Sequence, residues 1–370
     1  MIPVCEPLLI GNELDYVVKA MSSNWISSSG EYVTRFEEDF AKYIGTRYAL
    51  TAVNGTAALH LACLALGLGS GDEVIIPDFT MISSAFAICY TGSKPVFVDA
   101  ELESWNIDSS RIEEKITSRT KAIMPVHIYG QPCNMKAISE LASKYNLRVL
   151  EDAAEVHGAM FEAKKCGSMG DISCFSFFAN KVITSGEGGM IATNDKNLYD
   201  SCRYFKNLAF PLDGPRDYIH QDIGFNYRMT NLAAAIGLAQ LEKIELYIAK
   251  RRKNAALYRE FLKDIPGLKL QPESPGTFNV YWMNGIVVGD EFGPSRNRLR
   301  DELKTRGIDS RNFFFPMHRQ PALAKYGCET KDLYPVPDYL SERGLYLPSG
   351  SGLTESQIEF ICQQIRDIRK

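Results

Sequence analysis

The sequence lacks the patterns that mark membrane, secreted and metal-binding proteins. No run of about 18 apolar residues occurs, so no membrane span is expected, and the amino terminus lacks the basic start and apolar run of a secretion signal. The nine cysteines form no Cys-x-x-Cys pair, and an odd number does not complete a disulfide framework, which favours reduced thiols in a cytoplasmic protein. Five histidines without metal-type spacing predict no metal site.

The chain also has little net charge and no repeats. A formal net charge of −4 and a pI near 5.9 provide no basic field that would hold nucleic acid. At 45% hydrophobic and 23% charged residues, the composition is that of an ordinary globular protein. Its 370 residues exceed the roughly 250 to 300 of a single core. We therefore expect two domains, at residues 1–240 and 241–370.

Short apolar segments alternate with helical patterns in the first half of the chain. Strands are predicted from Tyr48 and at 73–77, 95–99, 121–127 and 148–152, with helices starting near 11 and at 31–44, 80–91, 108–117 and 134–146. This alternation predicts a mainly parallel sheet with helices on both faces. Ligands of such sheets bind beyond the carboxyl ends of the strands, and Asp152 stands at such an end.

The carboxyl-terminal third has a different pattern. One long helix is predicted over 231–264, closed by Pro266-Gly267. After it, strands at 280–283 and 285–288 and a helix at 295–306 indicate a smaller mixed α/β domain. The long helix is expected to bridge the two domains.

The segment 176–189 contains the lysine on which the functional argument depends. Its sequence predicts a strand that ends, turns tightly and begins again, with Lys181 between Phe178 and Val182. Burial in such surroundings lowers the pKa of a lysine, and the neutral amine attacks a carbonyl to form a Schiff base. An ordinary lysine at a strand end, with its amine in water, fits this segment equally well.

Two other segments have polar groups that suit a cofactor. Asn54-Gly55-Thr56 at a helix start offers N–H groups and a hydroxyl to a phosphate, although N-capping alone is the more frequent use of such a turn. Asp152 either caps the next turn or pairs with a cationic ring nitrogen. With Lys181 and Ser176, these groups match the needs of pyridoxal phosphate. No Gly-x-Gly-x-x-Gly follows the first strand, which argues against a dinucleotide.

With these residues placed, the chain resembles the DegT/DnrJ/EryC1/StrS family of sugar aminotransferases. The resemblance covers nearly the whole chain and rests on ordered motifs at 27–30, 54–59, 127–131, 151–155, 176–189 and 224–230. It implies an α/β, aspartate-aminotransferase-like fold, which is fold type I of the pyridoxal phosphate enzymes. That fold has a large, mostly parallel sheet domain and a smaller C-terminal α/β domain.

The resemblance implies that pyridoxal 5'-phosphate is the cofactor. Lys181 would bind its aldehyde and move the proton in catalysis, Asp152 would hold the pyridine nitrogen, and Glu155 would lie near the ring hydroxyl. Asn226 of a neighbouring subunit would reach the phosphate, which implies a homodimer with active sites at its interface. The complete implied set of cofactor-binding residues is Gly55, Thr56, Met81, Asp152, Glu155, Ser176, Lys181 and Asn226.

Met81 is a departure from the family pattern, because many members have an aromatic residue there that stacks on the cofactor ring. A thioether also contacts rings, so cofactor binding is still expected. The residues implied to contact the substrate are Trp25, Ser27, Ser29, Tyr129, Glu187, Arg228, Arg311, Phe313 and His318. On composition alone, the serine-rich loop is more typical of a plain connection than of a ligand contact, and the phenylalanines at 313–315 are more typical of a core.

The implied reaction moves the amino group of L-glutamate to the 4-keto carbon of a nucleotide-linked 4-keto-6-deoxy sugar. The amino-acid sequences of the lysine segment and of 310–316 resemble those of family members that favour GDP-4-keto-6-deoxy-D-mannose as the acceptor, which would give GDP-perosamine. A dTDP- or UDP-linked 4-keto or 3-keto sugar is the alternative. Sugar dehydratases of this family replace the lysine with histidine, so Lys181 argues against dehydration. A regulatory protein that binds pyridoxal phosphate without turnover is a remote alternative.

Overall fold

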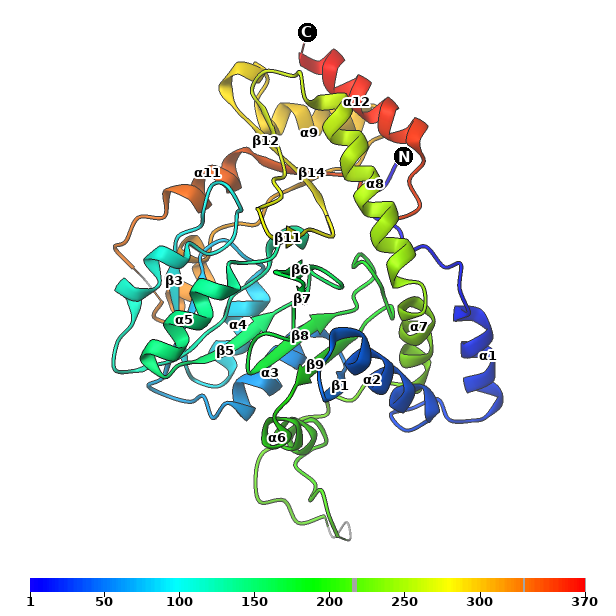
Figure 1. Cartoon of the computed structure of the whole chain (residues 1–370), viewed down its shortest axis with the longest axis vertical. Coiled ribbons are helices and arrows are strands. Elements are labelled where there is room, and N and C mark those ends of the chain that lie inside the picture. Colours follow the sequence, from blue (N-terminus) through cyan, green and yellow to red (C-terminus); the bar gives the residue numbers. More distant parts are fainter. Residues whose placement is uncertain (215–217, 329, 370) are drawn as a thin grey trace.

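A seven-stranded sheet is the largest element of the computed structural model, which describes residues 1–214, 218–328 and 330–369. The strands lie in the order β1-β9-β8-β5-β4-β2-β3 (Figure 1). Their bounds are β1 Tyr48–Ala52, β2 Glu73–Pro77, β3 Lys94–Val98, β4 Thr120–Ile123, β5 Arg148–Asp152, β8 Ile172–Ser176 and β9 Gly189–Thr193. Every pairing is parallel except those of β9, which runs antiparallel to β1 and β8. The predicted, mainly parallel sheet is confirmed.

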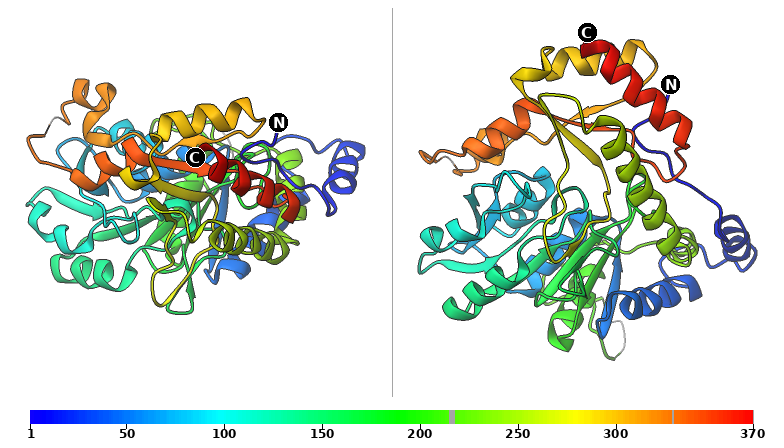
Figure 2. Two further views of the ribbon diagram at one scale, coloured as in Figure 1. Left: turned by 90° about the horizontal axis from the view of Figure 1, so that it is seen from above. Right: turned by 45° about the horizontal axis from the view of Figure 1, so that its top comes forward.

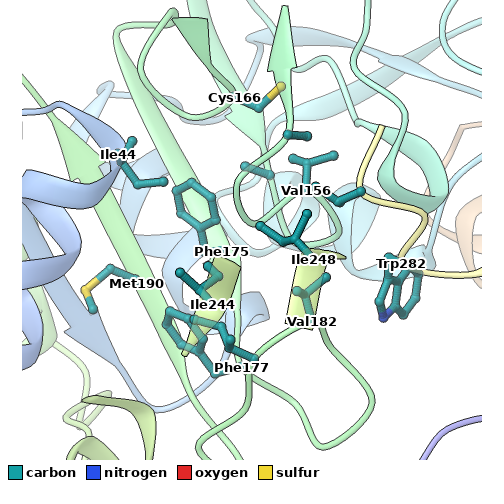
Figure 3. Close-up of a cluster of buried hydrophobic side chains, with 14 of the residues drawn as sticks. Ile44, Val156, Cys166, Phe175, Phe177, Val182, Met190, Ile244, Ile248 and Trp282 are labelled. Atoms are coloured by element: carbon teal, nitrogen blue, oxygen red, sulfur yellow. The ribbon is translucent and has the colours of Figure 1, made fainter. Parts of the chain in front are cut away.

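Helices cover both faces of this sheet, which explains why its strands are apolar throughout. One face packs against α3 Gly55–Ala65, α4 Ile82–Tyr90 and α6 Lys196–Lys206. The other face packs against α2 Glu31–Ile44 and α7 Asn231–Leu241 near β1 and against α5 Met135–Tyr145 near β4. Figure 3 shows part of the core beside α2, where Ile44, Phe175, Phe177 and Met190 gather.

A second, antiparallel sheet of order β10-β12-β14-β13 forms in the C-terminal part. Its strands are β10 Leu268–Leu270, β12 Asn284–Val288, β13 Arg311–Asn312 and β14 Gly344–Leu347. Helices α8 Ile244–Leu262, α9 Arg296–Thr305 and α12 Glu355–Arg369 share its core. In Figure 1, α8 runs from beside α7 to beside α12. The boundary at 240/241 stays a prediction.

Smaller elements complete the described chain. They are α1 Glu13–Ser22, α10 Pro321–Lys325, α11 Pro335–Arg343 and the three-stranded sheet of β11 Thr277–Phe278, β6 Met160–Phe161 and β7 Lys164–Lys165. The first residues of the chain join the C-terminal part, because the N–H of Ile2 donates to the carbonyl of Gly307 at 2.7 Å. Figure 2 shows both termini at this end. None of the described helices is long and apolar enough to cross a membrane.

Three predicted elements are wrong in detail. The helix at 108–117 is two short 3-10 turns, at 109–111 and 113–115, because Asp108 accepts the N–H of Ser110 at 3.0 Å and so favours a local turn over a helix. The helix at 231–264 is divided into α7 and α8, with Glu242 and Lys243 between them.

The predicted strand at 280–283 does not form. Tyr281 has a φ of 48°, and the side chain of Asn279 accepts its N–H at 2.7 Å. This turn breaks the extended backbone, and the strand begins only at Asn284.

Gly130 lets this turn pack against the large sheet domain. Its φ is +101°, and a Cβ built on it would lie 2.7 Å from the backbone nitrogens of Tyr281 and Trp282. Only glycine adopts this conformation and permits this approach without strain. The close contact between the two backbones fixes the position of Trp282 relative to β4 and β5.

We expect the substitution Gly130→Ala to lower the free energy of unfolding by about 2–3 kcal/mol, since the new methyl group forces two backbone segments apart. The control is Gly307→Ala, where φ is also positive but the added Cβ has no atom of the described residues within 4 Å, apart from those of its chain neighbours, so only about 1–2 kcal/mol of backbone strain is expected. Urea denaturation of both variants measures the difference. Equal losses would contradict the role of close packing at Gly130.

Candidate active site

A cavity of about 470 Å³ lies at the carboxyl ends of the parallel strands, where the sequence placed the ligand. Segments after β1, β2, β4, β5 and β8 all contribute to its wall, and residues of the C-terminal part close it. Nine of the residues predicted for the site line this cavity: Gly55, Thr56, Met81, Asp152, Glu155, Ser176, Lys181, Glu187 and Arg311.

Lys181 lies in the loop between β8 and β9, nearly buried, with 10% of its side chain exposed. Its Nζ is 3.8 Å from Oε1 of Glu155 and 3.7 Å from the centre of the Trp282 ring. Burial lowers the pKa of Lys181, while the negative charges of Glu155 and Asp152 oppose that shift. The cavity therefore favours the neutral, nucleophilic form of this amine more than water does.

Asp152 is a buried carboxylate at the end of β5 that fits a cationic ring nitrogen. It accepts hydrogen bonds from the hydroxyl of Ser84 at 2.7 Å and from the N–H of Ala154 at 3.2 Å. Burial raises its pKa, against the effect of these hydrogen bonds. Among the described side chains, no basic group lies within 4 Å of its oxygens. A protonated pyridine nitrogen would supply the missing positive partner.

Glu155 connects the lysine to the segment after β4. Its Oε2 accepts the N–H of Tyr129 at 2.7 Å, while Oε1 faces Lys181. Burial raises the pKa of Glu155 to about 7, although the charge of Lys181 works in the other direction. Tyr129 is fully buried and has a φ of 52°, so its N–H is aimed by a backbone conformation that is rare outside glycine.

A candidate phosphate seat lies where α3 begins. The side chain of Asn54 caps this helix by accepting the N–H of Ala57 at 2.8 Å, so the capping role considered for Asn54 is confirmed. Gly55 and Thr56 occupy the first turn, whose N–H groups have no partner within a helix and attract anions. A Cβ on Gly55 would lie 2.9 Å from that of Ser176, so glycine brings the helix start and the Ser176 hydroxyl together.

A buried network beneath Asp152 holds the strand ends in place. Glu151 accepts the N–H groups of Gly167, Met169 and Gly170 at 2.6–2.7 Å. It also lies 3.2 Å from Nε2 of His127. Because Nδ1 of His127 accepts the N–H of Cys133 at 2.9 Å, Nε2 is the nitrogen that donates to Glu151. His127 is thus part of the scaffold.

The serine-rich loop lies outside this cavity. Trp25 is 60% exposed and lines a second hollow of about 470 Å³ with Lys19 and Tyr32. Ser27 and Ser29 are exposed on the same loop. Asn231 holds the loop by donating to the carbonyl of Trp25 at 2.6 Å. The predicted substrate contacts of Trp25, Ser27 and Ser29 stay predictions.

Asn226 and Arg228 do not line the cavity of their own chain either. Arg228 donates to the side chains of Asn226 at 2.9 Å and Asn207 at 2.8 Å. The exposed side chain of Asn226 is therefore oriented by Arg228. Both assignments stay predictions.

Two of the predicted aromatic contacts lie behind the cavity wall. Phe313 is buried against Trp105 and Tyr129, with ring centres 5.0 and 4.9 Å apart. The N–H of Phe314 donates to the hydroxyl of Tyr129 at 3.2 Å. The structure thus places Phe314, and neither Phe313 nor Tyr129, on the cavity surface.

His318 is held by a buried carboxylate rather than aimed into the cavity. Both its backbone N–H and its Nδ1 lie 2.7 Å from oxygens of Asp78, which follows β2. Burial works to lower the pKa of His318, but the hydrogen bond and charge of Asp78 raise it overall. This pair fastens the segment 315–319 to the large sheet.

The cavity residues that were not predicted from the sequence include Asn180, Trp282, Phe314 and Tyr346. The signal for Asn180 was its place beside Lys181. Trp282 and Tyr346 come from the C-terminal part, and nothing in their local pattern distinguishes them from core residues.

A family model described as the DegT/DnrJ/EryC1/StrS aminotransferase family matches residues 8–366. The chain belongs to this family. A relative within it, the GDP-perosamine synthase of Escherichia coli O157:H7, is 46% identical over 366 residues, 99% of this chain and 98% of that one. The GDP-perosamine synthase of Vibrio cholerae is 43% identical over 367 residues, 99% of each chain.

The family also has solved structures with this fold. DesV from S. venezuelae, solved in complex with a ketimine intermediate, has a TM-score of 0.90 at 31% identity, covering 97% of this chain and 94% of that one. The aspartate-aminotransferase-like fold is thereby confirmed. Enzymes of this family depend on pyridoxal phosphate, and this chain is a pyridoxal phosphate-dependent sugar aminotransferase.

His157 is a fully buried ring between the lysine loop and β8. It packs 5.5 Å from Phe175 and 5.3 Å from Phe177, measured between ring centres. Neither ring nitrogen makes a hydrogen bond of good geometry within the described residues. Burial and the charge of Lys181 lower the pKa of His157 to about 3. The folded protein therefore holds this ring neutral at pH values where an unfolded chain protonates it.

This shift predicts a loss of stability in acid. Below a pH of about 6.5 the unfolded chain binds a proton that folded His157 refuses, so the free energy of unfolding falls by about 1.4 kcal/mol per pH unit, down to a pH of about 3. We expect His157→Leu to remove this contribution. Urea denaturation of the wild type and the variant at pH 7 and pH 5 measures the contribution of His157, because all other titratable groups are the same in the two proteins. If the free energy of unfolding changed equally between pH 7 and pH 5 in the wild type and in His157→Leu, the buried neutral state of His157 would be refuted.

Proposed function

We propose that the enzyme transfers the amino group of L-glutamate to carbon 4 of GDP-4-keto-6-deoxy-D-mannose and so forms GDP-perosamine. One observation carries the proposal: the cavity brings Lys181, Asp152 and the phosphate seat together in a chain that is 46% identical, over its whole length, to a GDP-perosamine synthase. Glutamate is proposed as the donor from the family resemblance.

The chain's own residues perform the acid–base work of the transfer. Bound pyridoxal phosphate supplies the aldehyde that accepts the amino group and the ring that withdraws electrons. Lys181 removes a proton from the carbon that carries the amino group and returns one on the new sugar carbon, which sets the stereocentre. Asp152 keeps the ring nitrogen protonated, and Glu155 faces the amine of Lys181 at 3.8 Å and fixes its direction.

The mouth of the cavity suits a nucleotide diphosphate. Arg311, the first residue of β13, is exposed and lines the cavity with Phe314 and Tyr346. A guanidinium binds phosphate oxygens in pairs, and flat rings stack on a sugar or base. Because GDP-, dTDP- and UDP-linked sugars all have a diphosphate, Arg311 does not select GDP. The identity to the perosamine synthases supports guanosine, and the alternative dTDP- and UDP-linked sugars are outcomes of the test.

The site is completed, in this proposal, by a second copy of the chain. Asn226 and Arg228 lie outside their own cavity, and the region around them exposes Ile223 at 86%. Helix α1 exposes Leu14 at 78% and Met21 at 54%. Exposed apolar side chains in this number favour an interface. A twofold interface would bring the segment 223–228 of each subunit to the other's phosphate seat.

We place the enzyme in the cytoplasm. All nine cysteines are free, and seven of them are buried. Thiols persist in this state in a reducing compartment.

A panel of keto sugars tests the proposed reaction. The full-length protein, loaded with pyridoxal phosphate, is mixed with L-glutamate and GDP-, dTDP- or UDP-linked 4-keto-6-deoxy sugars. We expect 2-oxoglutarate and a product of matching mass with the GDP-linked sugar, and none from Lys181→Ala, which lacks the proton carrier while its circular dichroism stays unchanged.

The possible outcomes distinguish an error in the proposed acceptor sugar from an error in the proposed type of reaction. Amination of a dTDP- or UDP-linked sugar alone would replace the acceptor and keep the mechanism. Activity retained by Lys181→Ala would refute the assignment of the catalytic lysine. Cofactor binding without turnover on any donor would favour the regulatory alternative.

Mixed dimers test the shared site. Asn226→Asp places a negative charge against the proposed phosphate position and, like Lys181→Ala, is expected to be inactive alone. If the sites cross the interface, a dimer of the two variants has one site with both changes and one with neither. Refolding the two variants together should then restore roughly a quarter of the wild-type activity, since half of the dimers are mixed and half of their sites are intact. A mixture as inactive as its components would contradict the interface.

A further inference from the structure

Trp282 lines the cavity and makes directional contacts with Lys181 and with the residue before it, in addition to apolar packing. The amine of Lys181 lies 3.7 Å from the centre of its ring. Its indole N–H donates to the carbonyl of Asn180, the residue before the lysine, at 2.8 Å. Only 4% of Trp282 is exposed, and Figure 3 shows it at the margin of the buried cluster that includes Val182 and Ile248.

A buried arginine fixes the ring and the lysine to the same support. Arg251 of α8 donates through Nη2 to the carbonyl of Lys181 at 3.1 Å. Through Nη1 it donates to the carbonyls of Trp282 at 2.6 Å and Ser349 at 3.2 Å. The backbones of residues 181 and 282 are therefore held to one guanidinium, and the indole N–H adds a second connection. This arrangement leaves the ring little freedom to move relative to the amine.

The geometry has a chemical consequence for the proton that the lysine carries. A cation over an aromatic face is attracted by the negative charge of the π-system, most strongly for tryptophan and most strongly where water is excluded. Lys181 alternates between amine and ammonium as it accepts and returns a proton. Burial disfavours the ammonium form, while the ring on one side and Glu155 at 3.8 Å favour it.

We propose that Trp282 is a positioning residue for Lys181, whose indole face holds the ammonium form during proton transfer and whose N–H fixes the lysine segment. The inference rests on the proposed function only through the role of Lys181 as proton carrier. It does not depend on which nucleotide sugar is the acceptor. Within the part of the chain that the structure describes, the other charged or titratable groups that act on Lys181 are Glu155, Asp152, Arg251 and His157, and none of these residues is substituted in the test.

The alternative, that Trp282 is an inert apolar wall, predicts the opposite sign. A wall keeps water from the amine, so shortening it admits water, favours the ammonium and raises the pKa of Lys181. A ring that attracts the cation stabilises the ammonium, so its removal lowers that pKa. One measured quantity therefore separates the two roles.

The experiment uses the full chain loaded with pyridoxamine 5'-phosphate, because the lysine amine is then free. Brief labelling with acetic anhydride between pH 6 and 10, followed by mass spectrometry of the peptide that contains Lys181, gives its apparent pKa. No sugar is present, so the result is independent of the acceptor test. We expect Trp282→Leu to lower this pKa by roughly 0.5–1.5 units and Trp282→Phe to lower it by less, since a phenyl face binds cations more weakly.

Trp105 provides the matched control. It is another buried tryptophan, 3% exposed, and packs against Tyr129 and Phe313 without a contact to Lys181. Trp105→Phe should leave the pKa of Lys181 unchanged. A rise or no change in Trp282→Leu overturns the proposal, as does an equal decrease in Trp105→Phe. If Trp282→Leu does not fold, Trp282→Phe alone tests the proposal: a lower pKa of Lys181 supports it, and an unchanged or higher pKa overturns it.

Discussion

The structure around the cavity depends on the cost of removing charge from water. Lys181, Asp152 and Glu155 are withdrawn from solvent at the ends of β5 and β8, where an isolated charge is expensive. Each is therefore placed against the others or against a specific donor, such as Ser84 or the N–H of Tyr129. The same burial that raises the pKa of both carboxyl groups lowers the pKa of the lysine.

Burial of this kind requires a rigid frame, and the frame extends well beyond the cavity. Glu151 and His127 fix the ends of two strands beneath the site. Arg251 connects the lysine loop to the C-terminal part, and Asp78 fastens His318 to the large sheet. These groups touch no reacting atom. They decide whether atoms from distant parts of the sequence meet to within the few tenths of an ångström that proton transfer requires.

The sequence predicts those parts of the site that rest on local patterns. A parallel strand covered on both faces is apolar along its length, so the strands ending near Asn54 and at Asp152 are recognisable, and the residues after them belong to the cavity by topology. Trp282 is different. Its place depends on a left-handed backbone at Tyr281 and on contact with Gly130, about 150 residues away in the chain. The prediction of a helix at 108–117 fails for a different, local reason. The side chain of Asp108 accepts the N–H of Ser110 and so stabilises a short turn, although the spacing of apolar residues favoured a helix. Trp25 and Asn226 lie outside the cavity of their own chain, so the predicted contacts of these two residues stay predictions.

The reversed direction of β9 has a consequence for how Lys181 is presented. A parallel neighbour of β8 would require the chain to leave the carboxyl edge, cross the sheet through a helix and return at the opposite edge. With β9 antiparallel, the chain turns back at once, and both ends of the lysine segment stay anchored at the rim of the cavity: Phe177 receives a hydrogen bond from Ser185 and donates one to Gly188. The lysine is thus carried by a closed hairpin loop instead of by the start of a helix. A loop fixed at both ends can change the direction of a side chain with little displacement of its backbone, which would suit the repeated proton transfer proposed for Lys181.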